Sequence, residues 1–230
     1  MKIKGLQKLT LLDYPGKVAC TVFLGGCDFR CPYCHNMDIV LDSEEEDFID
    51  TDYLMSFLKK RSSMLEGVCI TGGEPRMSSD IEDFIRQIRD MGYSIKLDTN
   101  GSYPEKLRDL VSKGLVDYVA MDIKHSLEKY TAAAGCAGAL VEKVKESTAY
   151  LLEGHVPYEF RTTVAKPLHS VSDFESIGKW IGGDSPYFIQ CFAERPTVPD
   201  KTLTAPERAE LELMLDTAKK YLPRAELRGI

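Results

Sequence analysis

Three cysteines stand close together in the N-terminal part of the chain, at Cys27, Cys31 and Cys34. Their C-x3-C-x2-C spacing allows each thiolate to bind one iron of a cubane iron–sulfur cluster. Clusters that only carry electrons usually have four cysteine ligands, so this loop would leave the fourth iron without a protein ligand. The spacing therefore predicts an enzyme that holds another molecule on the open iron. A zinc site completed by His35, in a structural or electron-carrier protein, is the alternative.

The elements that must position this loop alternate regularly along the chain. Short apolar or β-branched runs predict strands, and helical patterns lie between them. The expected strands cover residues 18–24, 67–71, 94–98, 118–123, 158–164 and 187–192, and the expected helices cover 51–65, 81–91, 104–113, 140–152, 172–180 and 205–221. This order predicts an α/β fold with a parallel sheet. Six strands are too few for a closed eight-stranded barrel, but they can form a partial (β/α)6 TIM-like barrel, in one domain over residues 1–230.

The last helix carries its own start signal. Thr204 is the expected N-cap, Pro206 lies in the first turn, and Glu207 follows three residues after the cap. This arrangement predicts a capping box that begins the helix at residue 205.

Polar residues follow the expected strands at the point where each strand ends. The cysteine loop follows the first strand, and a glycine turn follows the second. The others are Asp98 and Thr99 after the third strand, Asp122 and Lys124 after the fourth, and Arg161 within the fifth. In parallel α/β folds the carboxyl ends of the strands meet at one face, where active sites form. The sequence therefore predicts one shared site.

Composition excludes several classes of function. The formal net charge is −7 and the sequence pI is near 5.2, whereas binding to nucleic acid or to an anionic membrane requires a basic surface. No run approaches the ~20 apolar residues of a membrane-spanning helix, and the N-terminus lacks the apolar stretch of a signal peptide. A cytoplasmic location is expected. The acidic residues 43–47 are expected to form a solvated loop.

The four cysteines outside the loop are not expected to form disulfides in that compartment. Cys20, Cys69 and Cys191 lie in apolar runs and are expected in the core, while Cys136 receives no role. His125, His155 and His169 show no partner pattern.

Together these motifs resemble the radical S-adenosylmethionine superfamily, and most closely its glycyl-radical activating enzymes. Within that group the chain is similar to the subgroup that activates anaerobic (class III) ribonucleotide reductase. The matching residues are the cysteine loop with Pro32, Tyr33, His35 and Asn36, the turn Gly72-Gly73-Glu74-Pro75, Asp98-Thr99-Asn100-Gly101, Asp122-Ile123-Lys124, and the opening stretches 5–8 and 12–17. The resemblance covers the chain to about Lys124.

The resemblance implies a 4Fe-4S cluster on the three cysteines and S-adenosylmethionine on its open iron. Tyr33 is expected near the adenine, and the backbones of Tyr33 and His35 would cradle the nucleoside. Gly72 and Gly73 would let the backbone approach the ligand closely. Glu74 would accept a hydrogen bond from the methionine ammonium.

Further site residues also follow from the resemblance. Asp98, Thr99 and Asp122 match positions that bind a monovalent cation in some activating enzymes, and a simple turn is the less favoured alternative for Asp98-Thr99-Asn100-Gly101. Lys124 would neutralise the methionine carboxylate, and Arg161 would be the remaining cation facing the ligand. Arg76 departs from the pattern, because many relatives carry a small polar residue there. It is expected at the mouth of the site, against an acidic partner, the ligand or solvent.

The implied reaction is reductive cleavage of S-adenosylmethionine to a 5′-deoxyadenosyl radical, which abstracts hydrogen from a glycine of anaerobic ribonucleoside-triphosphate reductase. The electron would come from an external donor such as flavodoxin or ferredoxin, because the chain has no second cysteine cluster. Two alternatives stay open. The substrate could be another glycyl-radical enzyme, or a small molecule as in deazapurine synthesis.

Overall fold

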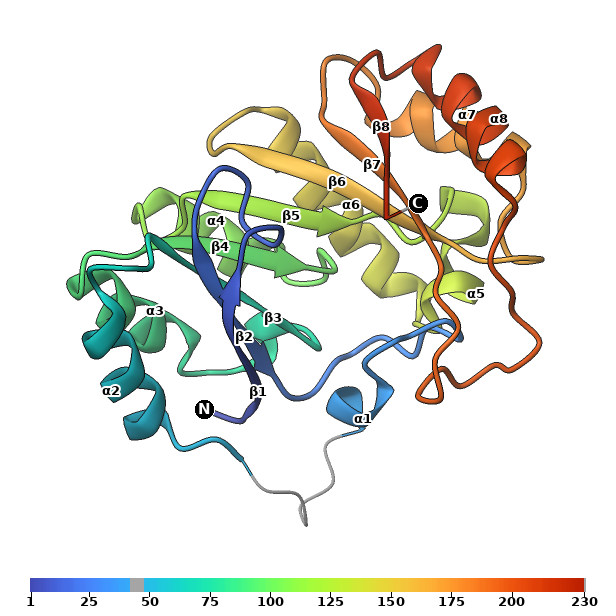
Figure 1. Ribbon diagram of the computed structural model, residues 1–230. Coiled ribbons are helices and arrows are strands. Elements are labelled where there is room, and N and C mark those ends of the chain that lie inside the picture. Colours follow the sequence, from blue (N-terminus) through green and yellow to red (C-terminus); the bar gives the residue numbers. More distant parts are fainter. Residues whose placement is uncertain (42–47, 230) are drawn as a thin grey trace.

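The computed structural model describes residues 1–41 and 48–229, so the acidic residues 43–47 lie outside the described part of the chain. The described residues form a sheet of eight strands whose spatial order follows the sequence (Figure 1). Only β1 is antiparallel to its neighbour, and the other pairs are parallel. The strands are β1 (Ile3–Thr10), β2 (Ala19–Leu24), β3 (Gly67–Gly72), β4 (Ser94–Thr99), β5 (Tyr118–Asp122), β6 (Tyr158–Val164), β7 (Tyr187–Cys191) and β8 (Ala225–Arg228).

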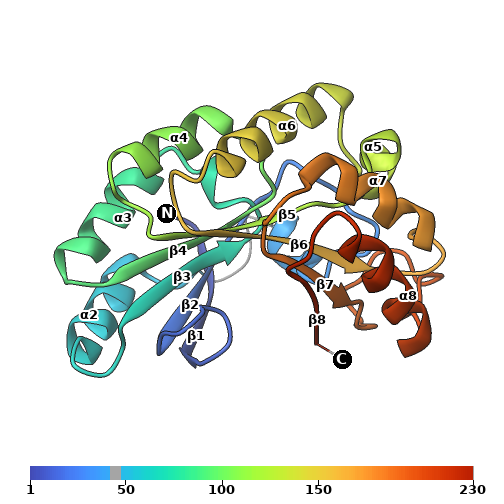
Figure 2. The same ribbon diagram turned by 90° about the horizontal axis from the view of Figure 1, so that it is seen from above.

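Helices cover the outer, convex face of the curved sheet, as Figure 2 shows from above. The longer ones connect successive parallel strands, which is the arrangement expected of βαβ units. The helices are α1 (Met37–Val40), α2 (Thr51–Arg61), α3 (Ile81–Asp90), α4 (Pro104–Ser112), α5 (Tyr130–Ala134), α6 (Gly138–Leu152), α7 (Val171–Ile181) and α8 (Arg208–Lys219). Two short 3-10 helices cover Pro75–Met77 and Leu127–Lys129. In these residues no helix is long and apolar enough to cross a membrane.

The sheet curves into a partial barrel whose edge strands, β1 and β8, do not pair with each other (Figure 2). The six predicted strands correspond to β2 through β7, so the parallel α/β prediction is confirmed and the strand number is corrected. β1 was missed because its sequence, IKGLQKLT, shows no apolar alternation, and only Ile3 and Thr10 are buried. β8 was missed because it spans four residues.

Side chains along β6 alternate between two environments, as the period of a strand requires. Phe160, Thr162 and Val164 are buried against the helices. Arg161 and Thr163 point to the other side and line a pocket inside the barrel. The strand therefore separates a hydrophobic core outside the sheet from a polar interior.

The expected start of the last helix is wrong. α8 begins at Arg208, and its N-cap is Glu207, which forms a capping box with Glu210. Thr204 instead pairs with Lys166 through two backbone hydrogen bonds of 2.9 and 3.0 Å. Because Thr204 is held in an extended backbone there, it cannot open the helix.

All seven cysteines are free. Cys20 and Cys69 are fully buried, as expected for core residues. Cys191 is only partly buried, so its assignment to the interior of the core was too strong.

Candidate active site

The carboxyl ends of β2 through β7 surround one pocket with a volume of about 240 Å³. Its position matches the face at which parallel barrels build active sites. Of the thirteen residues predicted for the site, only Glu74 does not line the pocket. The twelve that do are Cys27, Cys31, Tyr33, Cys34, His35, Gly72, Gly73, Asp98, Thr99, Asp122, Lys124 and Arg161. The topology thus brings together residues more than 130 positions apart in sequence.

Residues 25–36 form the wall of the pocket that carries the three thiols. This segment has almost no regular structure, so contacts from distant parts of the chain hold it in place. Arg30 N donates to the Ala134 carbonyl at 2.9 Å, at the end of α5. Thr197 Oγ1 donates to the His35 carbonyl at 2.7 Å, from the segment after β7. The loop is therefore fixed on two sides.

Cys31 is buried and Cys27 and Cys34 are partly buried, and this burial has a chemical consequence. Burial raises the pKa of Cys27 to about 12 and that of Cys31 to about 11, and it also raises the pKa of Cys34. Metal coordination requires the thiolate and displaces the proton, so cluster assembly should release protons here. In the described residues no three Cys, His, Asp or Glu side chains converge as the ligands of a single metal ion do. A cubane makes a different demand, because each thiolate binds its own iron.

The glycine turn after β3 packs directly against the segment after β2. A Cβ on Gly73 would collide with the Gly26 carbonyl oxygen, and one on Gly72 would collide with Leu24. Gly72 also has a φ of +118°, a backbone conformation that favours glycine. Both glycines are thus required by the close approach of two strand ends at the pocket.

The sequence predicted Arg76 at the mouth of the site, and this prediction is wrong. Its side chain is 0% exposed, and its Nε donates to Glu74 Oε1 at 2.9 Å. Its guanidinium also donates to Thr99 Oγ1 and to the Tyr103 carbonyl. Arg76 therefore joins the turn after β3 to the segment after β4, and contacts neither solvent nor the pocket.

Glu74 is equally buried, at 1% exposed, and its carboxylate already has several donors. Besides Arg76, it accepts hydrogen bonds from Thr99 Oγ1 at 2.8 Å and from the Asn100 backbone N–H at 2.7 Å. A direct contact between Glu74 and the methionine ammonium stays a prediction. It would require one of these donors to give way.

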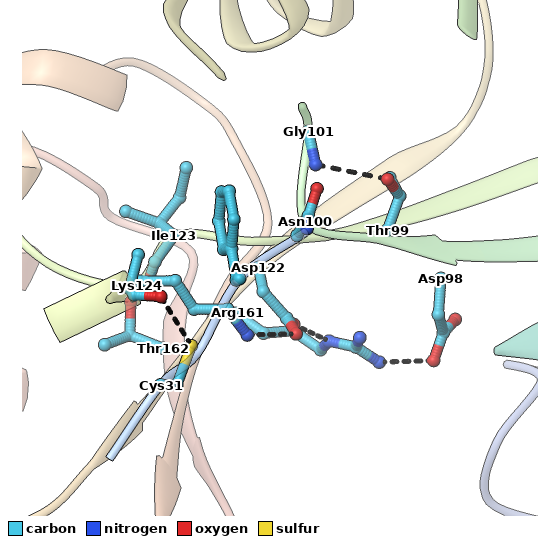
Figure 3. Close-up of polar contacts among 12 residues, drawn as sticks. Cys31, Asp98, Thr99, Asn100, Gly101, Asp122, Ile123, Lys124, Arg161 and Thr162 are labelled. Carbon is cyan, nitrogen blue, oxygen red and sulfur yellow. Dashed lines mark hydrogen bonds and ion pairs between the residues drawn. The ribbon is translucent and has the colours of Figure 1, made fainter. Parts of the chain in front are cut away.

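In the same pocket, Arg161 joins the carboxyl ends of β4 and β5 (Figure 3). Its Nε donates to Asp122 Oδ1 at 2.8 Å, and its Nη1 donates to Asp98 Oδ2 at 2.9 Å. Lys124 Nζ contacts Asp122 Oδ2 at 2.9 Å, and Lys96 Nζ contacts Asp98 Oδ1. We call these five residues the charge cluster.

The charges of the cluster determine the ionisation of its members. Burial alone would raise the pKa of Asp122, but the charges of Arg161 and Lys124 outweigh it and hold the pKa at about 2. Arg161 and Lys96 lower the pKa of Asp98 against the same effect of burial. Both carboxylates are therefore ionised at neutral pH.

Two histidines without an expected role stack behind this cluster. The rings of His125 and His169 lie 4.7 Å apart, and both side chains are buried. His169 Nε2 lies 2.9 Å from the Lys124 carbonyl, which also accepts a hydrogen bond from the Tyr33 hydroxyl at 3.4 Å. Tyr33 is therefore buried, with its ring edge against His169. Nothing in the local sequence pairs these residues, because the contact depends on the fold.

His35 differs from the stacked histidines because one of its ring nitrogens has no hydrogen-bond partner. Its ring stacks on Phe192 at 5.2 Å between centroids, and its Nε2 is buried without a hydrogen bond. Because an unpartnered buried nitrogen is costly, this atom is available to a ligand in the pocket. Asn100, Thr163 and Gln190 also line the pocket and were not predicted.

The three thiols and the cationic side chains of Lys124 and Arg161 line one pocket, and together they fit an iron–sulfur cluster with an anionic ligand beside it. Fold and site thus define a partial-barrel enzyme with an iron–sulfur cofactor. The chain belongs to the radical SAM superfamily, whose family model matches residues 21–181. Members of this superfamily use a 4Fe-4S cluster and S-adenosylmethionine, and these are the cofactors of this protein.

Within this superfamily the chain is similar to several curated proteins. A Methanocaldococcus jannaschii protein named "putative glycyl-radical enzyme activating enzyme" is 31% identical, covering 99% of this chain and 96% of its own. The pyruvate formate-lyase-activating enzyme of Clostridium pasteurianum is 28% identical over 54% of this chain and 52% of its own. A Halobacterium salinarum protein named "probable GTP 3′,8-cyclase" is 32% identical over 61% of this chain, but only 41% of its own.

Among solved structures, Streptococcus suis SuiB bound to the precursor peptide SuiA superposes with a TM-score of 0.70. The match covers 91% of this chain and 48% of SuiB, at 13% sequence identity. It shows that the two proteins share a fold.

Proposed function

We propose that this protein is the activating enzyme of a glycyl-radical enzyme, and that its target is an anaerobic ribonucleoside-triphosphate reductase. The observation that carries the first part is the match with the M. jannaschii relative, which spans nearly the full length of both chains. The GTP cyclase match leaves more than half of that relative uncovered. The second part rests on the resemblance of the opening stretches 5–8 and 12–17 to the reductase-activating subgroup.

When bound, the reduced cluster and S-adenosylmethionine supply a 5′-deoxyadenosyl radical, which takes a hydrogen atom from the target glycine. The chain's own residues bind and position. Cys27, Cys31 and Cys34 would each hold one iron. Lys124 and Arg161 would face the methionine carboxylate with positive charge, which strengthens the hydrogen bonds that they donate.

The same pocket would exclude water from the adenosyl end of the ligand. Tyr33 closes the wall there, because its ring is buried and its hydroxyl is bonded to the Lys124 carbonyl. His35 contributes its unpartnered ring nitrogen and its backbone. Flavodoxin or ferredoxin would deliver the electron from outside.

The shape of the fold is compatible with a polypeptide substrate. β1 and β8 leave the barrel unclosed in the described residues, and the pocket lies at the carboxyl ends of the strands. A loop of a partner protein could therefore reach the pocket from this end of the sheet.

The test mixes the anoxically reconstituted protein, a reductant, S-adenosylmethionine and the candidate reductase. We expect a glycyl-radical electron paramagnetic resonance signal, and no such signal with a reductase whose target glycine is replaced by alanine. Cleavage of S-adenosylmethionine without a glycyl radical would contradict the reductase assignment. The same assay with pyruvate formate-lyase tests the other glycyl-radical target.

A small-molecule substrate is the second candidate, and the GTP cyclase match favours it specifically. It predicts that purified GTP stimulates release of 5′-deoxyadenosine in the absence of any partner protein. If GTP has no effect while a glycyl-radical enzyme does, this candidate fails.

A further inference from the structure

Lys96 is a charged residue in a place where charge is costly. It lies in the middle of β4, and its residue is only 1% exposed. An ammonium group loses most of its hydration in such a position unless it is paired. Its Nζ contacts Asp98 Oδ1 and lies 3.8 Å from Cys69 Sγ, inside the barrel.

This ammonium is the second cationic partner of Asp98, and Asp122 has two cationic partners of its own. Asp98 Oδ1 contacts Lys96, and Asp98 Oδ2 accepts from Arg161. Asp122 Oδ1 accepts from Arg161, and Asp122 Oδ2 contacts Lys124. Each of the four carboxylate oxygens therefore already faces a cationic nitrogen of the protein.

The net charge of the charge cluster also disfavours a further cation. Three cationic side chains face two carboxylates, which leaves one positive charge uncompensated within the cluster. The next carboxylate along β6, Glu159, also raises the pKa of Arg161 by its charge, but it is paired with Arg228 at 2.8 Å and so offsets the excess charge only in part. A further cation placed beside Lys96, Lys124 and Arg161 would be repelled.

A monovalent cation held by Asp98, Thr99 and Asp122 therefore does not fit this chain. Thr99 Oγ1 is directed to Glu74 at 2.8 Å and contacts Arg76, so it is also engaged elsewhere. We propose that the buried ammonium of Lys96 takes the place of a free monovalent cation, so that the pocket binds the carboxylate of S-adenosylmethionine with the protein's own charges. The proposal is independent of which substrate the enzyme acts on.

The experiment measures binding of S-adenosylmethionine to the reconstituted protein by equilibrium dialysis, without turnover. Potassium, sodium, ammonium and choline chloride are compared at one ionic strength, because screening must stay constant. For the unaltered protein we expect the same affinity in all four salts. An affinity several-fold higher in potassium than in choline chloride would overturn the proposal.

Lys96→Gln should create the cation dependence that the unaltered protein lacks. In choline chloride its affinity for S-adenosylmethionine should fall by about tenfold or more, because Asp98 loses a charged partner. Potassium or ammonium should restore a large part of that loss. Lys145→Gln is the matched control, since Lys145 is exposed on α6 and pairs with Glu142 at the surface. A Lys96→Gln protein that binds weakly and ignores the cation would contradict the substitution of one charge for the other.

A second measurement does not depend on any variant folding. Thallium(I) imitates potassium, and its binding to the unaltered protein can be followed by its nuclear magnetic resonance signal. We expect no saturable site near the pocket. A stoichiometric site near the pocket in the unaltered protein, or one that S-adenosylmethionine strengthens, would overturn the proposal.

Discussion

Glu74 and Arg76 form an ion pair with a 2.9 Å contact between Oε1 and Nε, and both side chains are 0% exposed. They are two residues apart in a 3-10 turn, yet each also bonds to the segment after β4. The pair therefore holds the ends of two neighbouring strands in register beside the pocket. A buried charge pair of this kind acts on geometry more than on net stability.

Breaking the pair from one side should be costly. Arg76→Met leaves the Glu74 carboxylate buried with fewer donors, and we expect a loss of about 3–5 kcal/mol in the free energy of unfolding. Urea unfolding followed by circular dichroism measures this. Arg86→Met is the control, because the Arg86–Glu82 pair is on the surface and its removal should change the unfolding free energy little. Equal effects of the two substitutions would contradict a structural role for Arg76.

Gly73→Ala should disable the site. Its Cβ would collide with the Gly26 carbonyl, directly before the first cluster cysteine. We expect the reconstituted variant to bind fewer than half the irons of the unaltered protein and to lose binding of S-adenosylmethionine. Gly138→Ala is the matched control, because nothing lies near that position and alanine favours the helix by about 0.5–1 kcal/mol. Normal iron content in Gly73→Ala would show that the turn can move without consequence.

Cys34→Ala should abolish a stable cubane, because two thiolates cannot hold three irons. Iron and sulfide analysis of anoxically reconstituted protein tests this, together with the visible absorption of the cluster. Cys136→Ala is the comparison, since Cys136 lies in the loop after α5 and does not line the pocket. An intact, redox-active cubane in Cys34→Ala would contradict the ligand assignment.

The stacked histidines predict a dependence of stability on pH. Burial lowers the pKa of His169 to about 4, although its hydrogen bond to the Lys124 carbonyl opposes the shift. In the unfolded chain a histidine titrates near 6.5, so the unfolded state binds more protons between these values. Stability is therefore complete above pH 6.5 and falls by up to about 1.4 kcal/mol per pH unit as the pH decreases toward 4.

The check compares urea unfolding of the unaltered protein and of His169→Gln between pH 7 and 5. The unfolding free energy of the variant should decline less steeply as the pH falls, because the variant lacks the buried histidine that titrates differently in the folded and unfolded states. His155→Gln serves as the control, since His155 is 49% exposed. Parallel pH profiles for all three proteins would contradict a neutral, buried His169.

The sequence was sufficient to predict the site because the site depends on chain order. Polar residues at five consecutive strand ends must meet when the strands are parallel and neighbouring, as β2 through β6 are. The prediction that Cys27, Cys31 and Cys34 are the cluster ligands needed no tertiary information either, because it rests on their spacing. These are the features that local sequence specifies.

What the sequence did not predict depends on contacts between distant residues. The position of Arg76 is decided by Thr99 and Tyr103, which lie in another unit of the fold. The local sequence does not distinguish Lys96 from other lysines in strands. Its burial beside Asp98 inside the barrel follows from the position of β4 in the sheet. The start of α8 shifted because Thr204 pairs with Lys166 instead of capping a helix. In each case a local preference lost to a partner that the sequence pattern does not identify.

Arg161 offers the sharpest test of how the pocket binds an anion. Its guanidinium bridges Asp98 and Asp122, so its removal takes away a positive charge and the side-chain link between the two aspartates. We expect Arg161→Gln to weaken binding of S-adenosylmethionine by about tenfold to a hundredfold, as for loss of a charge-assisted contact. Arg161→Lys should recover only part of this loss, because an ammonium cannot reach both carboxylates as the planar guanidinium does. Arg89→Gln is the matched control: Arg89 also pairs with an aspartate, Asp117 at 2.6 Å, but at the opposite end of β4 and β5. If Arg161→Gln binds the cofactor as tightly as Arg89→Gln does, Arg161 holds the barrel together and does not attract the ligand.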